Sequence, residues 1–559
     1  MNFFSFVFML ILWGILSLSV LMLLKNDEGF ARSRKNFFIA ALLLSGMFLP
    51  IYAKVAISKE FVFASSDEDI LKQNYEKYVS LRNFALVEHA SGPSMLVFMQ
   101  NIQLLTGLEL DTIVFLLGLF LSALTPAFVF FFFLKFSKSY RLSLGAAFLA
   151  FFSSFFIWPT IEVRPQQAGF LIALAVLWLF KDFEENRKPS SLAVCSILTV
   201  SLSAIHVLSF YYILPMLVAL TVYFIMKNNG LHYAYFFVPV LAWVAGIILN
   251  NSFFYIIYDL QWALRYSVPA LPAVFTEIIL LPYGIKLFVP VVGLATLLIA
   301  FIFAAVAALK WLGRKISVKE AVERVSAFVD LNFAKIFAAL MAVSLLMLAV
   351  QVLISFDQIM WLYSNSLPKF VFLELGNIFF GAAGVGGLLY IIRNKRNNSA
   401  GMLLVSLTLA GVFASTLLMG IVMTAGFNNF ALRTLNYLVI FLAFFAFYAL
   451  TQVKMQPKLK YAALLILLFF PATLALGTRD PGVLNIVVTY FDVEEAKQVG
   501  FSNHFIVVNS LRDNLPVPTT RGDPSIYYND YSKDLVVNST QRIVLFPNSR
   551  ANELMGQKK

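Results

Sequence analysis

The chain is built mainly from apolar segments that are long enough to cross a lipid bilayer, separated by short charged connections. A membrane-spanning helix needs about 20 predominantly apolar residues, and such segments recur along most of this sequence. Hydrophobic residues make up 60% of the 559 residues and charged residues only 13%, whereas soluble domains are roughly half apolar and a quarter charged. The sequence therefore predicts an all-α polytopic membrane protein.

The apolar segments predict a membrane domain over residues 1–477 with about fourteen spans. The expected spans are 3–24, 37–56, 111–134, 142–158, 167–180, 190–207, 209–226, 232–250, 287–309, 334–355, 370–392, 400–424, 434–451 and 461–477. The first span has neither a basic start nor a small-residue cleavage site, so we interpret it as a retained helix and not as a signal peptide.

Basic residues concentrate in alternate connections between these spans. They are Lys25, Arg32, Arg34, Lys35, Lys135, Lys138, Arg141, Lys181, Arg187, Lys188, Lys310, Arg314, Lys315, Lys319, Arg324, Arg393, Lys395, Arg396, Lys454, Lys458 and Lys460. Because cytoplasmic loops carry an excess of Lys and Arg, these connections are expected in the cytoplasm of a multi-pass plasma-membrane protein. Both termini, a large first loop at 57–110, a stretch at 251–286 and a tail at 478–559 are then extracytoplasmic.

Several of these connections have patterns of their own. Residues 94–108 and 310–335 each predict an amphipathic helix lying along the membrane surface. The aromatic and proline-rich stretch 251–286 predicts an interfacial or re-entrant element. In the tail, short apolar runs at 486–490, 505–508, 535–537 and 543–546 predict strands, and 492–498 predicts a helix, so we expect a small extracytoplasmic α/β domain.

Composition also excludes some classes of site and partner. The single Cys195 lies in an apolar run, so neither a disulfide framework nor a cysteine metal site is expected, and no cofactor or metal site is indicated. The net charge of +12 arises from basic residues beside apolar segments, so the expected partner is the anionic surface of membrane lipids and not nucleic acid.

Three consecutive carboxylates, Asp67, Glu68 and Asp69, follow the second span in the first outer loop. Carboxylates at the membrane face could supply the general base for an acceptor hydroxyl, or could hold a divalent metal ion. The alternative is a solvated acidic turn.

Three basic side chains lie at outer ends of spans, where ionisable groups are expensive to place and often functional. Arg164 and Arg433 lie in tight outer turns and could hold a phosphate, or could pair within the chain or reach lipid headgroups. His206, just before Ser209 and Tyr212, could orient a phosphate or shuttle a proton, or could be a packing residue. Because the topology places all of them on one side, we expect them to converge on one pocket with the acidic residues.

In the order of its motifs and spans the chain resembles the GT-C superfamily of membrane glycosyltransferases, which includes protein mannosyltransferases, aminoarabinose transferases and oligosaccharyltransferase catalytic subunits. The resemblance rests on the acidic triplet in the first outer loop, Gly92-Pro93 before an apolar helix, the Arg164-Pro turn and His206 before an aromatic span. It departs from the family in having a reduced proline motif and an additional first span. The tail also lacks a motif like Trp-Trp-Asp-Tyr-Gly, so we do not expect one of the superfamily's oligosaccharyltransferase catalytic subunits.

The resemblance implies transfer of a sugar from a polyprenyl-phosphate-linked donor to a lipid, glycan or protein acceptor on the outer face. It implies that Asp67, or Glu68 or Asp69, is the base, and that Arg164, His206 and Arg433 bind the donor phosphate. A transporter or flippase for a lipid-linked or amphipathic substrate is the alternative, although a clear repeat and a mid-span charge cluster are missing from the sequence.

Overall fold

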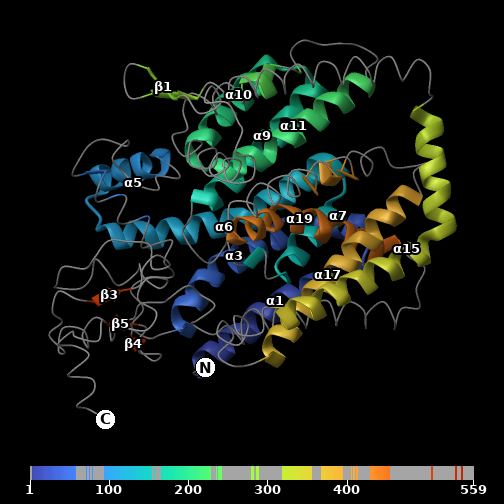
Figure 1. Cartoon of the computed structure of the whole chain (residues 1–559), viewed down its shortest axis with the longest axis horizontal. Coiled ribbons are helices and arrows are strands. Elements are labelled where there is room, and N and C mark those ends of the chain that lie inside the picture. The colour runs from blue at the N-terminus through green and yellow to red at the C-terminus, as the bar shows by residue number, and fades with distance from the viewer. Residues whose placement is uncertain are drawn as a thin grey trace, which may run out of the picture.

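The described part of the protein is almost entirely helical (Figure 1). The computed structural model describes residues 3–57, 71, 75, 78–79, 93–153, 156–157, 165–227, 235, 237–241, 278–281, 285–288, 318–354, 367–393, 404–405, 407–409, 411–412, 428–452, 505–507, 536–537 and 543–545. Its helices are α1 (Phe3–Lys25), α2 (Glu28–Ser33), α3 (Lys35–Ile57), α5 (Pro93–Thr106), α6 (Leu110–Ser137), α7 (Tyr140–Ala150), α9 (Pro165–Asn186), α10 (Pro189–Ile205), α11 (Val207–Lys227), α15 (Val318–Ile354), α17 (Leu367–Arg393) and α19 (Asn428–Gln452).

These helices confirm most of the expected helical segments that fall on described residues. Within this part of the chain, three stretches are long and apolar enough to cross a membrane, namely Thr112–Ser137, Pro165–Asn186 and Glu374–Ile392. The expected spans 232–250, 287–309, 400–424 and 461–477 lie wholly or largely outside the described residues. The total of about fourteen spans therefore stays a prediction.

One expected span is shorter in the structure. α7 ends at Ala150, and the backbone N–H groups of Phe151, Phe152 and Ser153 bond three residues back, which tightens the chain into a turn. Eleven helical residues rise about 16 Å, roughly half of a ~30 Å hydrocarbon core. The prediction of one uninterrupted span over 142–158 is therefore wrong.

The expected surface helix at 310–335 is continuous with the following segment. α15 is a single helix of 37 residues, because no glycine or proline interrupts it between Val318 and Ile354. Figure 1 shows a bend in it, with the first half at the edge of the molecule and the second half beside α17. The helix end that we expected near residue 334 is not found, because α15 continues through this position.

Strands occur in two places. β1 (Ile278–Leu281) and β2 (Ile285–Phe288) form an antiparallel hairpin. This hairpin was not predicted, and β2 takes up the start of the span expected at 287–309. Its turn signal is Pro282-Tyr-Gly284 between two apolar runs.

In the tail, β3 (Phe505–Val507), β4 (Val536–Val537) and β5 (Ile543–Leu545) form an antiparallel sheet in the order β3-β5-β4. Three of the four predicted strand segments are thus confirmed. The run at 486–490 and the helix at 492–498 lie outside the described residues, so the complete α/β domain stays a prediction.

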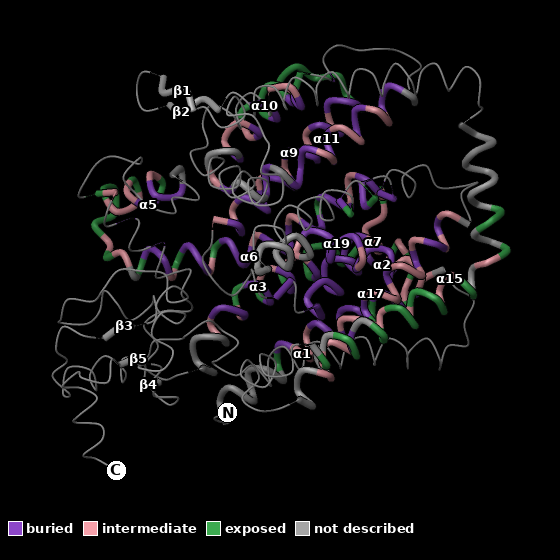
Figure 2. Tube along the Cα trace, viewed as in Figure 1, coloured by how far each residue is buried: buried purple, intermediate pink, exposed green. Residues whose placement is uncertain are grey.

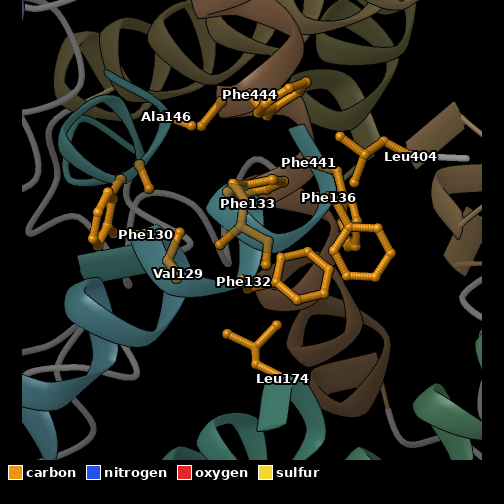
Figure 3. Packing of buried hydrophobic residues seen from close by; sticks show 14 of the residues in the cluster. Val129, Phe130, Phe132, Phe133, Phe136, Ala146, Leu174, Leu404, Phe441 and Phe444 are labelled. Carbon is orange, nitrogen blue, oxygen red and sulfur yellow. The ribbon is translucent and has the colours of Figure 1, made fainter. Parts of the chain in front are cut away.

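An aromatic core joins α6 to α19, as Figure 3 shows. The rings of Phe133 and Phe444 stack with centroids 4.8 Å apart, and Phe441 meets Phe132 and Phe133 edge-on at 5.8 and 5.9 Å. Leu174 of α9 also lines this cluster. Figure 2 shows that α6, α7, α9, α11 and α19 carry most of the buried positions, whereas α10 and α15 have exposed faces.

Glycines permit the closest helix contacts around this core. A Cβ on Gly387 of α17 would collide with the backbone of Phe445 in α19, and a Cβ on Gly145 of α7 would collide with the ring of Phe447. Small residues at such crossings let helix backbones approach closely in a membrane, where van der Waals packing drives association. α19 is thereby fixed between α6, α7 and α17.

Candidate functional site

The most distinctive polar group in the described helices is the imidazole of His206, which is 5% exposed. α10 ends at Ile205 and α11 begins at Val207, so His206 is the extended residue between two consecutive helices, with φ −156° and ψ 114°. Its Nδ1 accepts a hydrogen bond of 3.1 Å from the backbone N–H of Ser209. This bond satisfies one of the free donors at the start of α11, as a helix cap does.

The imidazole is linked through Ser209 to a distant part of the chain. The Ser209 hydroxyl lies 2.7 Å from His206 Nδ1 and also bonds the hydroxyl of Tyr437 in α19, 228 residues away. Ser209 is fully buried and Tyr437 is 4% exposed. Three polar side chains from α11, α19 and the α10–α11 junction therefore form one buried chain of hydrogen bonds, which we name the His206 chain.

Aromatic packing holds the His206 chain in place. The rings of Tyr212 and Tyr437 stack with centroids 4.4 Å apart, and Phe170 of α9 lies 5.3 Å from the ring of Tyr437. Gly169, one residue earlier, lies so close that a Cβ there would collide with Ser209 Oγ and come within 2.7 Å of His206 Cβ. α9, α11 and α19 therefore meet at this point with no room for another side chain.

Two buried amides continue the polar region along the start of α9. Gln166 and Gln167 are 2% and 1% exposed, and Gln167 Nε2 donates to Ser122 Oγ of α6 at 3.1 Å. Buried polar side chains in membrane helices are rare and usually mark function or helix association.

The first two basic connections, 25–35 and 135–141, lie together at the other end of the helix bundle. Glu28 accepts hydrogen bonds from the Ser139 hydroxyl at 2.6 Å and from the backbone N–H groups of Tyr140 and Arg141 at 2.7 and 3.1 Å. The Arg141 guanidinium donates to the carbonyls of Leu23 and Leu24 at the end of α1. Burial lowers the pKa of this guanidinium, while Glu28 opposes the shift. The connections at 25–35 and 135–141 are thereby joined.

The third basic connection, 181–191, is held to the connection 135–141 by ion pairs. Lys135 lies 2.5 Å from Asp182 and 2.9 Å from Glu185, and Lys138 lies 3.0 Å from Glu185. Asp182 also accepts from the hydroxyl of Ser191 in α10 at 2.7 Å. We name the connections 25–35, 135–141 and 181–191 the basic end.

The His206 chain lies at the opposite end of the helices from the basic end. α10 starts directly after Lys188 and ends directly before His206, and its 17 residues rise about 25 Å, most of a ~30 Å hydrocarbon core. α19 runs in the opposite direction to α10: its later residues Phe441 and Phe444 pack near the last turns of α6, so Arg433 lies on the far side of Tyr437 from the basic end.

The structure describes only some of the predicted site residues. His206 is buried and hydrogen-bonded, as given above. Arg433 belongs to α19, four residues before Tyr437, and its side chain is outside the described residues. Arg164, which directly precedes the first residue of α9, and Asp67, Glu68 and Asp69 also lie outside the described residues. The expected convergence on one pocket stays a prediction.

Sequence reasoning missed some members of this polar region. Ser209 and Tyr212 could be noted because they follow His206 closely, and Gln167 belongs to the Arg164-Pro turn segment. Tyr437 had no sequence signal, since 228 residues separate it from Ser209. Among the described residues, no group of three or more His, Cys, Asp or Glu side chains could hold a metal ion.

A scan against models of protein families finds no match, and a search of curated proteins finds none either. Three solved structures of the oligosaccharyltransferase of Archaeoglobus fulgidus are similar in fold. The complex with Zn and sulfate has a TM-score of 0.47 and 15% identity over 88% of this chain and 56% of that one. The apo form has a TM-score of 0.47 and 13% identity, over 83% of this chain and 58% of that one. The form tethered to an acceptor peptide containing the NVT sequon has a TM-score of 0.45 and 13% identity, over 83% of this chain and 57% of that one.

This chain thus spans less than three fifths of the length of that oligosaccharyltransferase. With TM-scores below 0.5, the likeness decides neither the family nor the activity of this protein.

Proposed function

We propose that this chain is a membrane glycosyltransferase of the GT-C type, which transfers a sugar from a polyprenyl phosphate to a lipid, glycan or protein acceptor. The observation that carries the proposal is the buried His206 chain at the end of the bundle opposite the basic end. By the positive-inside rule the basic end is cytoplasmic, so His206 lies toward the outer face. A lipid-linked sugar on the outer leaflet would meet the protein at that end.

Two arginines that are close in sequence to residues packed around His206 support a phosphate site there. Arg433 lies four residues before Tyr437, and residues at this spacing share one face of a helix with Cβ atoms about 5–6 Å apart. Arg164 directly precedes α9, whose Gly169 packs against His206. Guanidinium and imidazole groups suit the oxygens of a phosphate leaving group, so we propose that Arg164, Arg433 and His206 bind it together.

In the proposed reaction the acceptor oxygen attacks the anomeric carbon of the donor. The bond between that carbon and the phosphate oxygen breaks, and the phosphate leaves with the electron pair. The acceptor proton passes to a carboxylate of the acidic triplet, with Asp67 as the first choice and Glu68 or Asp69 as alternates. Arg164, His206 and Arg433 stabilise the charge that develops on the departing phosphate.

A transporter or flippase of a lipid-linked or amphipathic substrate is the second candidate, as the sequence left it open. It differs in its product, since transport leaves the sugar on its original lipid.

The first step of the test is mass spectrometry of glycolipids and glycoproteins from a deletion strain, which identifies the sugar that is lost. The purified chain in proteoliposomes is then given the corresponding labelled polyprenyl-phosphate sugar. We expect label in an acceptor and free polyprenyl phosphate. Movement of intact donor between leaflets without transfer would instead establish the transporter.

Variants test the roles of the side chains. Loss of the base, by Asp67→Asn, Glu68→Gln or Asp69→Asn, should reduce kcat by about 10²- to 10⁴-fold at the residue that acts. Arg433→Gln should reduce it by about 10²- to 10³-fold. Lys188→Gln, at the exposed basic end, is the matched control and should leave the rate unchanged. Full activity in all three carboxylate variants would remove the proposed base.

A further inference from the structure

The hydrogen bonds of the His206 chain have a defined direction. The backbone N–H of Ser209 can only donate, so His206 Nδ1 accepts and carries no proton. The Ser209 hydroxyl, 2.7 Å from the same nitrogen, must then donate to it. Since its hydrogen is used in that bond, Ser209 Oγ accepts from the hydroxyl of Tyr437. The chain runs in one direction, from Tyr437 through Ser209 to His206.

This direction fixes the chemical form of the imidazole. With Nδ1 unprotonated, the ring is neutral and its single proton is on Nε2. His206 is therefore a neutral N–H donor and not an imidazolium cation. Hydrogen bonds in series polarise one another, so the hydroxyls of Tyr437 and Ser209 strengthen this arrangement in their buried setting.

The same chain ties His206 to α19. The ring of Tyr437 packs against the stacked ring of Tyr212 and the tilted ring of Phe170, so its hydroxyl has little freedom to move. Arg433 is one helical turn away on α19. The distance between the imidazole and the helix that carries Arg433 therefore depends on the bond between Ser209 and Tyr437.

We propose that Ser209 and Tyr437 are positioning residues, which hold His206 as a neutral Nε2–H donor and set its place relative to α19. The ligand in this inference, the phosphate of a polyprenyl phosphate, rests on the proposed function, whereas the form of the imidazole does not. In this inference Tyr437 acts on the phosphate site through His206.

The first experiment observes the imidazole directly. The full-length protein in nanodiscs is labelled with ¹⁵N and ¹³C at its 4 histidines, and His206→Gln assigns the signal of His206. In the wild type at neutral pH we expect one form, with the proton on Nε2. Neither Ser209→Ala nor Tyr437→Phe removes the backbone N–H at position 209, so the proton should stay on Nε2 in both variants. We expect the Nδ1 signal to shift away from its wild-type position, because each variant removes a hydroxyl from the chain of hydrogen bonds that ends at this nitrogen.

The matched control is Tyr448→Phe, which removes the same hydroxyl from the same helix eleven residues, or about three turns, further along. It should leave the His206 signal unchanged. Two variants of the chain are used so that a folding defect in one does not decide the result. A wild-type His206 with a proton on Nδ1, or a Tyr437→Phe spectrum identical to that of the wild type, would overturn the inference.

The second experiment measures binding of polyprenyl phosphate to the same nanodiscs. We expect Tyr437→Phe to weaken binding roughly five- to tenfold, as the loss of one hydrogen bond does. In the His206→Gln background the same substitution should have no further effect, because Tyr437 acts through that ring. Additive losses would show that Tyr437 has a separate structural role, and would refute the positioning assignment.

Failure of the two proposals can be told apart. If the wild type binds no polyprenyl phosphate, the donor site under the proposed function is wrong, and the histidine spectra still decide the form of His206. If the lipid binds but the spectra show Nδ1 protonated, the positioning inference is wrong and the donor site stands.

Discussion

Substitution of Gly169 by alanine tests the packing on which the candidate site depends. A Cβ at this position would lie 2.7 Å from His206 Cβ and would collide with Ser209 Oγ. Two carbon atoms rest at about 3.5–4.0 Å, so α9 and the α10–α11 junction must separate by roughly 0.8 Å or more. Ser209 and His206 both belong to this junction, so their 2.7 Å bond can move with them, and the cost falls on the packing of α9 against the junction.

We therefore expect Gly169→Ala to lower the free energy of unfolding by roughly 1–3 kcal/mol, the usual range for overpacking. The assay is thermal unfolding followed with a thiol-reactive dye. Cys195 is the only cysteine of the chain and is buried in α10, so the dye reports the exposure of that helix. The midpoint should fall by several degrees.

The matched control is Gly381→Ala in the interior of α17. A Cβ there would meet nothing within 4 Å. Alanine favours a helix over glycine by about 1 kcal/mol, so this variant should melt at or above the wild-type temperature. If Gly169→Ala melts like Gly381→Ala, the contact between α9 and His206 is looser than described and the reasoning is refuted.

Three further predictions concern the rest of the chain. Asp182→Ala should destabilise the basic end by about 2–3 kcal/mol, because it removes bonds to Lys135 and Ser191 and leaves Glu185 as the ion-pair partner of Lys135 among the described residues; wild-type melting in the dye assay would contradict this. Cysteines introduced at Lys315 and Asn538 should label from opposite sides of the membrane, with position 315 in the cytoplasm, and labelling of both from one side would overturn the topology. Deletion of residues 480–559 should lower the melting temperature or impair acceptor binding without preventing insertion, since a domain of this size is marginal unless it docks; unchanged melting and activity would exclude docking.

Local apolar patterns predicted the positions of helices well where residues close in sequence decide whether a helix forms. Apolar runs gave the positions of α1, α3, α6, α10 and α11 to within a few residues, because a helix in lipid must satisfy its backbone hydrogen bonds within itself. The predictions failed where the length of an apolar segment was taken as the length of a helix. α7 ends early, α15 continues without a break, and the hairpin of β1 and β2 replaces the start of an expected span.

The candidate site could be predicted only in part. His206 was singled out because an ionisable group at the end of a span is expensive to place. Its chemical form was not predicted, because the form depends on which donors reach Nδ1. Ser209 supplies two of them through the local turn, and Tyr437 completes the chain from a helix that lies far away in the sequence.

The sequence by itself determined that this protein needs lipid as its solvent, that most of it is helical, and that its basic connections alternate. Each of these follows from composition and spacing along the chain, which no folding step changes. Only the tertiary structure decided that three basic connections share one end and that His206 meets Tyr437 at the other. The physical reason is that helix packing in a membrane depends on contacts such as Gly387 against Phe445 and Phe133 against Phe444. Such contacts depend on the complementary shapes of residues that are far apart in the sequence, so the order of residues in the chain does not reveal them.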